Sequence, residues 1–175
     1  MTTSTPVPLE KVFFADGSAD GVSAADSEAA GEALADGTID IVATDHAPHP
    51  TESKECEWQE ASFGMLGLET ALSIVQKTMV DSGMMNWSSV ADRMSIAPAR
   101  IGGYENHGLP LVVGSIANLV VINPRLKWTV DRDLVLSKSS NTPYHGRELP
   151  GVVTHTFFKG KATLINGSVT QMGGM

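Results

Sequence analysis

The sequence has little cysteine, few positive charges and no long hydrophobic run. Cys56 is the only cysteine among the 175 residues, which excludes an internal disulfide framework. The formal net charge of -8 argues against nucleic acid or an anionic membrane as a partner. No apolar run approaches the roughly 20 residues that a membrane-spanning helix needs. We therefore expect a protein of the reducing cytoplasm.

Length sets a second limit. The 175 residues, 42% hydrophobic and 18% charged, suffice for one domain with a buried core, or for a small domain with an appendage. A complete eight-stranded α/β barrel needs about 250 residues, so this chain is too short to form one.

The pattern of apolar and turn-forming residues divides the chain into three parts. Residues 1–26 are rich in Ser, Thr, Gly, Ala and Asp, and we expect a flexible arm there. Residues 27–100 predict α/β structure: a helix over 27–35, a strand over 39–44, a polar loop over 50–64, and helices over 66–80 and from 87 to just before Pro98. Ser27 and Ser88 are the expected caps of the first and last of these helices.

The last part, residues 101–175, predicts a small β module. Short β-branched and apolar runs lie at 111–113, 117–122, 128–130, 152–158 and 161–165. The pair Asn166-Gly167 between two such runs predicts a terminal hairpin with a type I′ turn.

One carboxylate and two imidazoles follow the predicted strand 39–44, in the run Asp45-His46-Ala47-Pro48-His49. Pro48 and Pro50 stop the strand there. Aspartate and neutral histidine are ligands that suit zinc, and both are common general acids and bases. Polar groups at the C-terminal end of a buried parallel strand are typical of barrel and doubly wound enzymes.

Several longer runs carry a resemblance to a known family. They are Asp36-Gly37-Thr38-Ile39-Asp40, Ala43-Thr44-Asp45-His46-Ala47-Pro48-His49, Phe63-Gly64, Gly67-Leu68-Glu69-Thr70-Ala71-Leu72, Ala97-Pro98-Ala99-Arg100-Ile101-Gly102 and Asn141-Thr142-Pro143-Tyr144-His145-Gly146. Together they resemble the C-terminal part of a dihydroorotase, a member of the metal-dependent amidohydrolase superfamily. The resemblance covers roughly residues 30–170. It implies an α/β fold: the last strand and helices of a TIM barrel, followed by a small β-sandwich-type module.

The resemblance also implies roles for four residues. Asp45 would be a ligand of a zinc cofactor and the catalytic group that moves a proton from water to the leaving amide nitrogen. His49 would contact the substrate carboxylate, and Phe63 and Gly64 would contact the dihydropyrimidine ring through their backbones. The residue pattern favours an outer-shell or packing role for His46, and it does not favour Cys56 as a ligand.

Other parts of the family's metal centre are absent from the sequence. The family uses a His-x-His pair and further histidines, and this chain contains no His-x-His. One carboxylate cannot hold a catalytic zinc, which needs about three protein ligands. We therefore expect a truncated or split dihydroorotase, inactive by itself, whose small-molecule substrate would be dihydroorotate or N-carbamoyl-aspartate.

Three further expectations concern partners and alternatives. A second chain could supply the missing barrel, or the chain could be a non-catalytic scaffold or binding subunit of a pyrimidine-pathway complex. A hydantoinase- or allantoinase-like amidohydrolase is a third reading, although the form of the Asp45–His49 run favours dihydroorotase. Since a lone barrel strand leaves open edges, we also expect self-association or partial disorder around residues 39–80.

Overall fold

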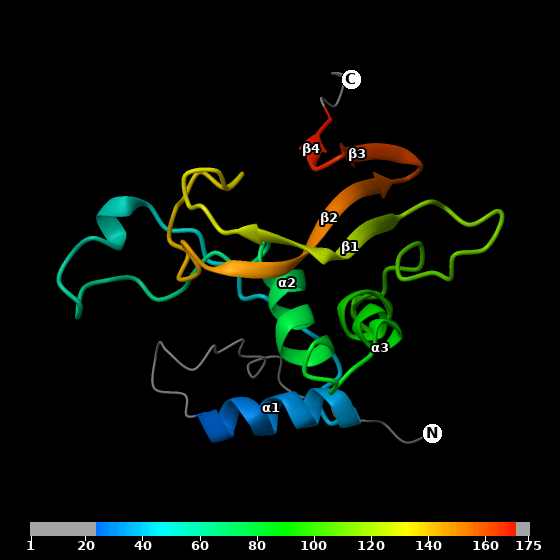
Figure 1. Cartoon of the computed structure of the whole chain (residues 1–175), viewed down its shortest axis with the longest axis horizontal. Coiled ribbons are helices and arrows are strands. Elements are labelled where there is room, and N and C mark those ends of the chain that lie inside the picture. Colours follow the sequence, from blue (N-terminus) through cyan, green and yellow to red (C-terminus); the bar gives the residue numbers. More distant parts are fainter. Residues whose placement is uncertain (1–23, 171–175) are drawn as a thin grey trace.

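The computed structural model describes residues 24–170, which form a helical part packed on a twisted antiparallel sheet (Figure 1). The helical segments are α1 (Ala24–Asp36), η2 (Thr51–Ser53), α2 (Ala71–Val75), η3 (Gln76–Val80), α3 (Trp87–Ala91), η4 (Asp92–Ile96) and α4 (Ala97–Ile101). The strands are β1 (Leu119–Thr129), β2 (Glu148–Phe158), β3 (Lys161–Ile165) and β4 (Ser168–Val169). None of the helices in this part of the chain combines the length and hydropathy needed to cross a bilayer.

The first predicted helix is present, but it begins at Ala24, before the expected cap Ser27. Residues 24–26 therefore belong to α1, and the rest of the predicted arm lies outside the described residues. The helix ends as predicted at Gly37, which has a φ of 92° that glycine adopts without strain. The Asp36 carboxylate accepts the backbone N–H of Thr38 at 2.8 Å, and this hydrogen bond holds the Asp36 pKa below its ordinary value.

The predicted strand 39–44 does not form a strand in the structure. The N–H of Val42 donates to the carbonyl of Arg93 at 3.0 Å, and a single parallel bridge joins His46 to Met65. A strand needs a neighbour to complete its ladder, and within residues 24–170 this segment meets loops and helices instead.

The helix predicted over 66–80 is shorter, because it begins at Ala71 and continues through η3 to Val80. Of its predicted apolar stripe, Val75 and Met79 are buried, whereas Leu68 precedes the helix and is 64% exposed. The N–H groups of Gly67 and Leu68, just ahead of the helix, donate to the His46 imidazole.

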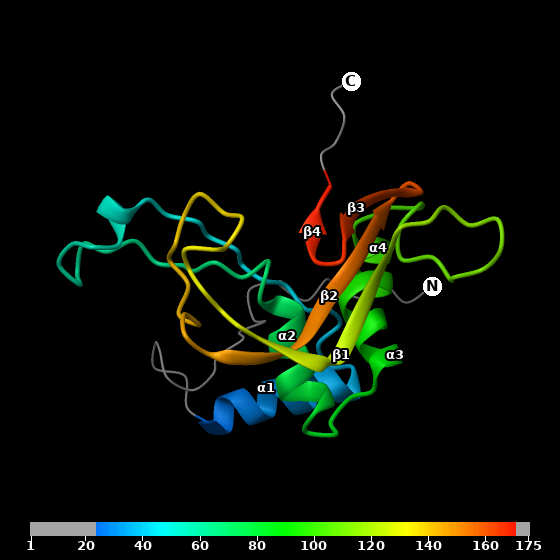
Figure 2. The same cartoon turned by 45° about the horizontal axis from the view of Figure 1, so that its top comes forward.

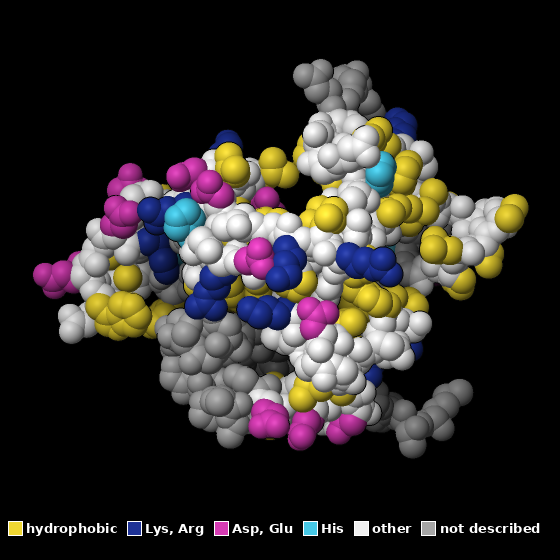
Figure 3. Space-filling view, viewed as in Figure 1, with side chains coloured by type: hydrophobic (Ala, Val, Ile, Leu, Met, Phe, Trp, Pro, Cys, Tyr) yellow, Lys and Arg dark blue, Asp and Glu magenta, His cyan; other side chains and the backbone are white. Residues whose placement is uncertain are grey.

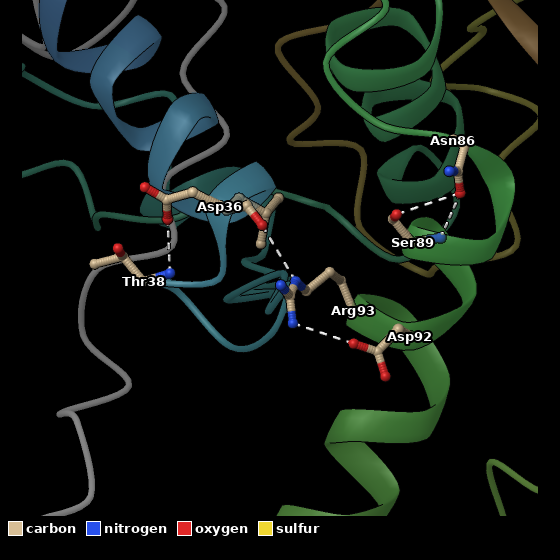
Figure 4. A network of polar contacts seen from close by, with 7 residues as sticks. Asp36, Thr38, Asn86, Ser89, Asp92 and Arg93 are labelled. Atoms are coloured by element: carbon tan, nitrogen blue, oxygen red, sulfur yellow. Dashed lines mark hydrogen bonds and ion pairs between the residues drawn. The ribbon is translucent and has the colours of Figure 1, made fainter.

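The next helix corrects two predictions. Its cap is Asn86, whose side chain accepts the Ser89 N–H at 2.9 Å, rather than Ser88 (Figure 4). The helix also continues past Pro98, through η4 into α4, and does not stop before it.

A π turn explains this passage through proline. In η4 the N–H of Ala97 bonds to the Asp92 carbonyl, five residues back. The Arg93 carbonyl would then need the N–H of Pro98, which proline lacks. That carbonyl accepts the N–H of Val42 instead, so the missing donor creates the docking point for the segment before Asp45.

The Arg93 side chain ties the same region to α1. Its Nε donates to the Leu34 carbonyl at 3.2 Å, and its Nη1 lies 3.1 Å from the Asp92 carboxylate. Figure 4 shows Arg93 between the end of α1 and Asp92. Leu34 and Val42 pack in one buried cluster that also contains Val75, Met79, Met85 and Val90. The helices therefore fix where residues 39–44 run.

The β module forms one four-stranded antiparallel sheet in the order β1-β2-β3-β4. The described residues thus contain a single layer, without the facing sheet of a sandwich, and residues 111–113 lie outside the strands. The predicted turn is confirmed, because Asn166 and Gly167 both have positive φ, 50° and 76°, as a type I′ turn requires.

Polar side chains lock α2 and η3 onto this sheet. The Ser73 hydroxyl donates to the Gly151 carbonyl at 3.1 Å and accepts the Trp128 indole N–H at 3.0 Å. The Gln76 amide donates to the Pro124 carbonyl at 2.9 Å. A second buried cluster of Ile74, Val130, Tyr144 and Leu149 surrounds this interface.

Candidate functional site

The loop segments 45–65 and 131–147 lie together at one end of the molecule, in both views (Figures 1 and 2). Asp45 lies where the first of these segments leaves the helical core. Its φ is 44°, in the left-handed region, where aspartate is better tolerated than most residues. Its side chain is exposed. The carboxylate therefore faces solvent at the edge of the fold.

The imidazole of His46 is turned back into the protein. Its Nδ1 accepts the N–H of Gly67 at 3.1 Å and that of Leu68 at 3.4 Å. A ring nitrogen that accepts hydrogen bonds carries no proton, so Nδ1 is the unprotonated nitrogen of this ring. This contact agrees with the expected packing or outer-shell role, since the Nδ1 lone pair is already used.

Lysine 54 organises the polar loop over 50–64. The Lys54 ammonium donates to the carbonyls of Ser62 at 2.7 Å and Gly64 at 3.1 Å. The loop also closes on itself through the Ser62 N–H, which donates to Ser53 at 2.9 Å. These contacts bring Phe63 and Gly64 back toward the segment after Asp45.

Gly64 lies close to the segment that carries Ala47 and His49. Its φ is 109°, and a Cβ built on it would lie 2.5 Å from the Ala47 Cβ and 3.4 Å from the His49 Nε2. Only glycine fits there, because any side chain would collide with Ala47. The structure thus brings His49 and Gly64, two of the predicted substrate-binding residues, into contact distance.

Phe63 is placed differently. Its side chain is 94% exposed, so the ring does not cover the site. The substrate contact of the Phe63 backbone that the family resemblance implies stays a prediction.

Asn141 is a site residue that no local pattern in the sequence singles out. Its Oδ1 accepts the His49 N–H at 3.2 Å, and its Nδ2 donates to the carbonyls of Ala47 at 2.9 Å and Gly64 at 3.3 Å. The sequence offered one signal, because Asn141 opens one of the runs that carry the resemblance. Nothing local in that run indicates contacts with residues more than seventy positions away.

The space behind Asp45 is a small hollow lined mainly by apolar groups. Its lining residues are Thr44, Met65, Gly67, Thr70, Ala71, Ile74 and Tyr144. Burial raises the pKa of the phenol of Tyr144, one of the lining residues, so this hydroxyl stays neutral. A neutral, largely apolar wall here supports the loop segments without adding charge to the site.

The donor set does not fit a zinc ion by itself. Within residues 24–170, no group of three or more His, Cys, Asp or Glu side chains converges as a metal site would require. Asp45 supplies one exposed carboxylate, and the Cys56 thiol is exposed with its Sγ 3.8 Å from the Ser53 carbonyl. We therefore derive no chemical step through a metal from these residues.

The known proteins that this chain resembles in sequence agree on one family. The family model described as "Amidohydrolase family" matches residues 15–163. The chain is 60% identical over 139 residues to a dihydroorotase of Streptomyces coelicolor, covering 79% of this chain and 32% of that protein. It is 47% identical over 146 residues to a dihydroorotase of Mycobacterium tuberculosis, covering 83% and 34%. The chain thus spans about a third of the length of the curated relatives it matches.

Solved structures of hydantoinases share the fold. The L-hydantoinase (dihydropyrimidinase) from Arthrobacter aurescens superposes with a TM-score of 0.78 at 31% identity, covering 85% of this chain and 34% of that one. The D-hydantoinase (dihydropyrimidinase) from Thermus sp. gives 0.76 at 25% identity, with 85% and 33% covered.

Proposed function

The chain belongs to the amidohydrolase family, and from this premise we propose that it is part of a dihydroorotase-type cyclic amide hydrolase. The enzyme would interconvert dihydroorotate and N-carbamoyl-aspartate. Residues 27–100 would correspond to the last strand and helices of the barrel, and residues 101–175 to the β module. Cytoplasmic action fits the exposed free thiol of Cys56, which persists in a reducing compartment.

One observation carries the proposal: the segment with Asp45 and His49 meets Gly64 at a contact that only glycine permits. These residue types are those expected at a dihydroorotase site, and the curated relatives with 60% and 47% identity are dihydroorotases. The sequence shared with these relatives and the closeness of His49 to Gly64 therefore support the same chemistry.

Each residue has a defined task in the proposed reaction. Water adds to the ring amide carbonyl and the carbon–nitrogen bond breaks, which gives an N–H group and a carboxylic acid that loses its proton to solvent. Asp45 would take the proton from the attacking water and return it to the departing nitrogen, so the carboxylate is regenerated. His49 would hold the substrate carboxylate, and Phe63 and Gly64 would hold the ring through their backbones.

We propose that zinc binds this site only when further residues supply the missing ligands. A bound zinc would make water nucleophilic near neutral pH. Asp45 would be one ligand, and the remaining donors would come from residues beyond those described, because residues 24–170 do not converge on a metal. This requirement is the reason to expect no turnover from the chain alone.

Exposed apolar side chains support the proposal that further polypeptide completes this fold. Leu111 is 79% exposed, Val113 106%, Leu134 78% and Leu136 73%. Figure 3 shows hydrophobic groups on the segment that projects at the right, where Figure 1 places the loop before β1. We propose that the remaining two-thirds of an amidohydrolase fold, carried by further polypeptide, covers such surfaces.

A hydantoinase-like activity is the second candidate. The structural match to the L-hydantoinase, with a TM-score of 0.78 and 31% identity, favours it. The two candidates differ in the ring and in its substituent, because hydantoin has a five-membered ring and dihydroorotate a six-membered ring with a carboxylate. His49 beside Gly64 favours the substrate that carries the carboxylate.

Co-expression tests the proposal. The chain would be produced together with the portion of the Streptomyces coelicolor relative that this chain does not span, and hydrolysis of dihydroorotate and of hydantoin would be measured with added zinc. We expect dihydroorotate turnover from the assembly, none from the chain alone, and a loss of about 10²- to 10⁴-fold in kcat for Asp45→Asn.

The other outcomes are equally informative. Preferential cleavage of hydantoin would favour the second candidate, and a stable assembly without turnover would favour a non-catalytic scaffold. Turnover by the isolated chain with stoichiometric zinc would contradict the proposed need for completion.

A further inference from the structure

Asn141 joins the two segments that carry the proposed substrate-binding residues. Its side chain bridges His49 and Ala47 on one segment to Gly64 on the other. Its backbone carbonyl adds a contact, accepting the Leu66 N–H at 3.1 Å. Four hydrogen bonds from one residue thus connect three separate stretches of the chain.

We propose that Asn141 is a positioning residue, which holds His49 and Gly64 in the register that substrate binding requires. The inference rests on the proposed function, since that function assigns substrate contacts to His49 and Gly64. Asn141 itself would touch no reacting atom. It would act through the placement of the two segments.

The chemistry of the amide explains why asparagine suits this position. One oxygen accepts from an N–H while the NH₂ group donates to two carbonyls, a combination that neither aspartate nor leucine offers. The amide therefore serves both segments at once and needs no charge to do so.

The hydrogen bonds at Gly64 also indicate which of its backbone groups can bind a substrate. The Gly64 carbonyl accepts from the Lys54 ammonium at 3.1 Å and from the Asn141 amide at 3.3 Å. A carbonyl oxygen has two lone pairs, and these two donors use both. Since no acceptor within residues 24–170 takes the Gly64 N–H, this N–H is the backbone group that Gly64 has left for a substrate.

Lys54 and Asn141 differ in how far along the sequence their hydrogen-bond partners lie. Lys54 binds carbonyls 8 and 10 positions away, so it shapes the loop internally. Asn141 binds groups 92, 94 and 77 positions away, so it sets where that loop lies relative to His49. Loss of Lys54 would loosen the loop, whereas loss of Asn141 would displace it from the site.

Asn118 provides a matched control in the same chain. Its Nδ2 donates to the Asn106 carbonyl at 2.9 Å, and its Oδ1 accepts the Lys159 N–H at 2.8 Å. This amide has the same kind of bridging contacts, but it lies in the β module. Variants of Asn118 therefore test loss of a bridging amide without change at the site.

Amide hydrogen exchange on the full chain is the first test, and it needs no activity. The His49 N–H reports the Oδ1 contact, and the Ala47 N–H, which donates to Met65 at 2.9 Å, reports the pairing of the two segments. In Asn141→Ala we expect both amides to exchange roughly fivefold faster. In Asn141→Asp only Ala47 should accelerate, because the carboxylate still accepts from His49 but repels the two carbonyls.

The second test separates positioning from a general loss of stability. In the co-expressed assembly, both Asn141 variants should raise the KM for dihydroorotate roughly tenfold and leave kcat within about twofold, since binding contacts are displaced while Asp45 is untouched. The corresponding Asn118 variants should change neither constant nor the two exchange rates.

The outcomes distinguish the two proposals. Unchanged exchange at His49 and Ala47 in Asn141→Ala, or no protection of His49 in the parent chain, overturns the positioning role. A lower kcat at constant KM also overturns it. Altered exchange in an assembly that hydrolyses no dihydroorotate supports the bridge and rejects the proposed function.

Discussion

Because Gly64 has no side chain, its segment can lie against the segment that carries Ala47 and His49. The φ of 109° and the predicted 2.5 Å approach of any Cβ to Ala47 both demand glycine. The contact links local backbone geometry to the placement of His49. It can be tested without any assay of activity.

Replacement of Gly64 by alanine should destabilise the chain by about 3 kcal/mol, because backbone strain and a steric collision add. Urea unfolding measures the change. Gly114→Ala is the matched control, since Gly114 has a similar φ of 96° but nothing within 4 Å of a new Cβ. It should lose only about 1 kcal/mol. Equal losses in the two variants would show that Ala47 moves aside freely.

His46 and Asn141 show what local sequence does not reveal at this scale. The residue pattern favours a packing or outer-shell role for His46, and the structure shows its imidazole accepting the N–H groups of Gly67 and Leu68. Asn141 was visible only as part of a run. Its partners become apparent when residues 92 and 77 positions away are brought beside it.

At the level of elements, α2 and η3 are held on the sheet by polar as well as apolar contacts. Ser73 is buried and has two partners, the Gly151 carbonyl and the Trp128 indole N–H. Buried polar groups destabilise a fold when they lose their partners. The helix is therefore fixed in rotation, which in turn fixes the residues that precede it.

Substitution Ser73→Ala should lower the free energy of unfolding by about 2 kcal/mol, because it leaves a buried carbonyl and an indole N–H unpaired. Thr78→Ala is the control on the same helix, since the exposed Thr78 hydroxyl only donates to Ile74 one turn back, at 2.8 Å. Thermal and urea denaturation should show little change there. A Ser73→Ala chain as stable as the parent would mean that water replaces the lost contacts.

The elements also show where pattern reasoning works. The turn at Asn166-Gly167 was predictable, because positive φ at two successive residues is a local demand. The end of the helix that runs from α3 through η4 into α4 was not predictable in this way. A proline such as Pro98 normally indicates a helix boundary. Here the π turn leaves the Arg93 carbonyl facing Pro98, which has no N–H, and the N–H of Val42 bonds to that carbonyl instead.

On the scale of the whole molecule, exposed apolar surface is the dominant feature. Leu111, Val112 and Val113 are 79%, 63% and 106% exposed on consecutive positions of one loop. Such a run is unfavourable in water and promotes association. The chain also spans only about a third of the length of its curated relatives.

The isolated chain should therefore self-associate, and the double substitution Leu111→Lys and Val113→Lys should shift it toward monomer. Sedimentation velocity over a concentration series measures this. Glu105→Lys is the control, because it changes the formal charge of the same loop by the same amount and removes no apolar side chain. A parent chain that stays monomeric at all concentrations would contradict the expectation.

The sequence by itself determined the family resemblance, the candidate residues Asp45, His49, Phe63 and Gly64, the first helix and the hairpin turn. These features depend on residue types at short spacing, which a linear pattern records directly. The tertiary structure alone decided that residues 39–44 dock on Arg93, that the helix continues past Pro98, and that Asn141 bridges His49 and Gly64. Those outcomes depend on where unpaired donors and acceptors from distant segments meet, and only packing determines that.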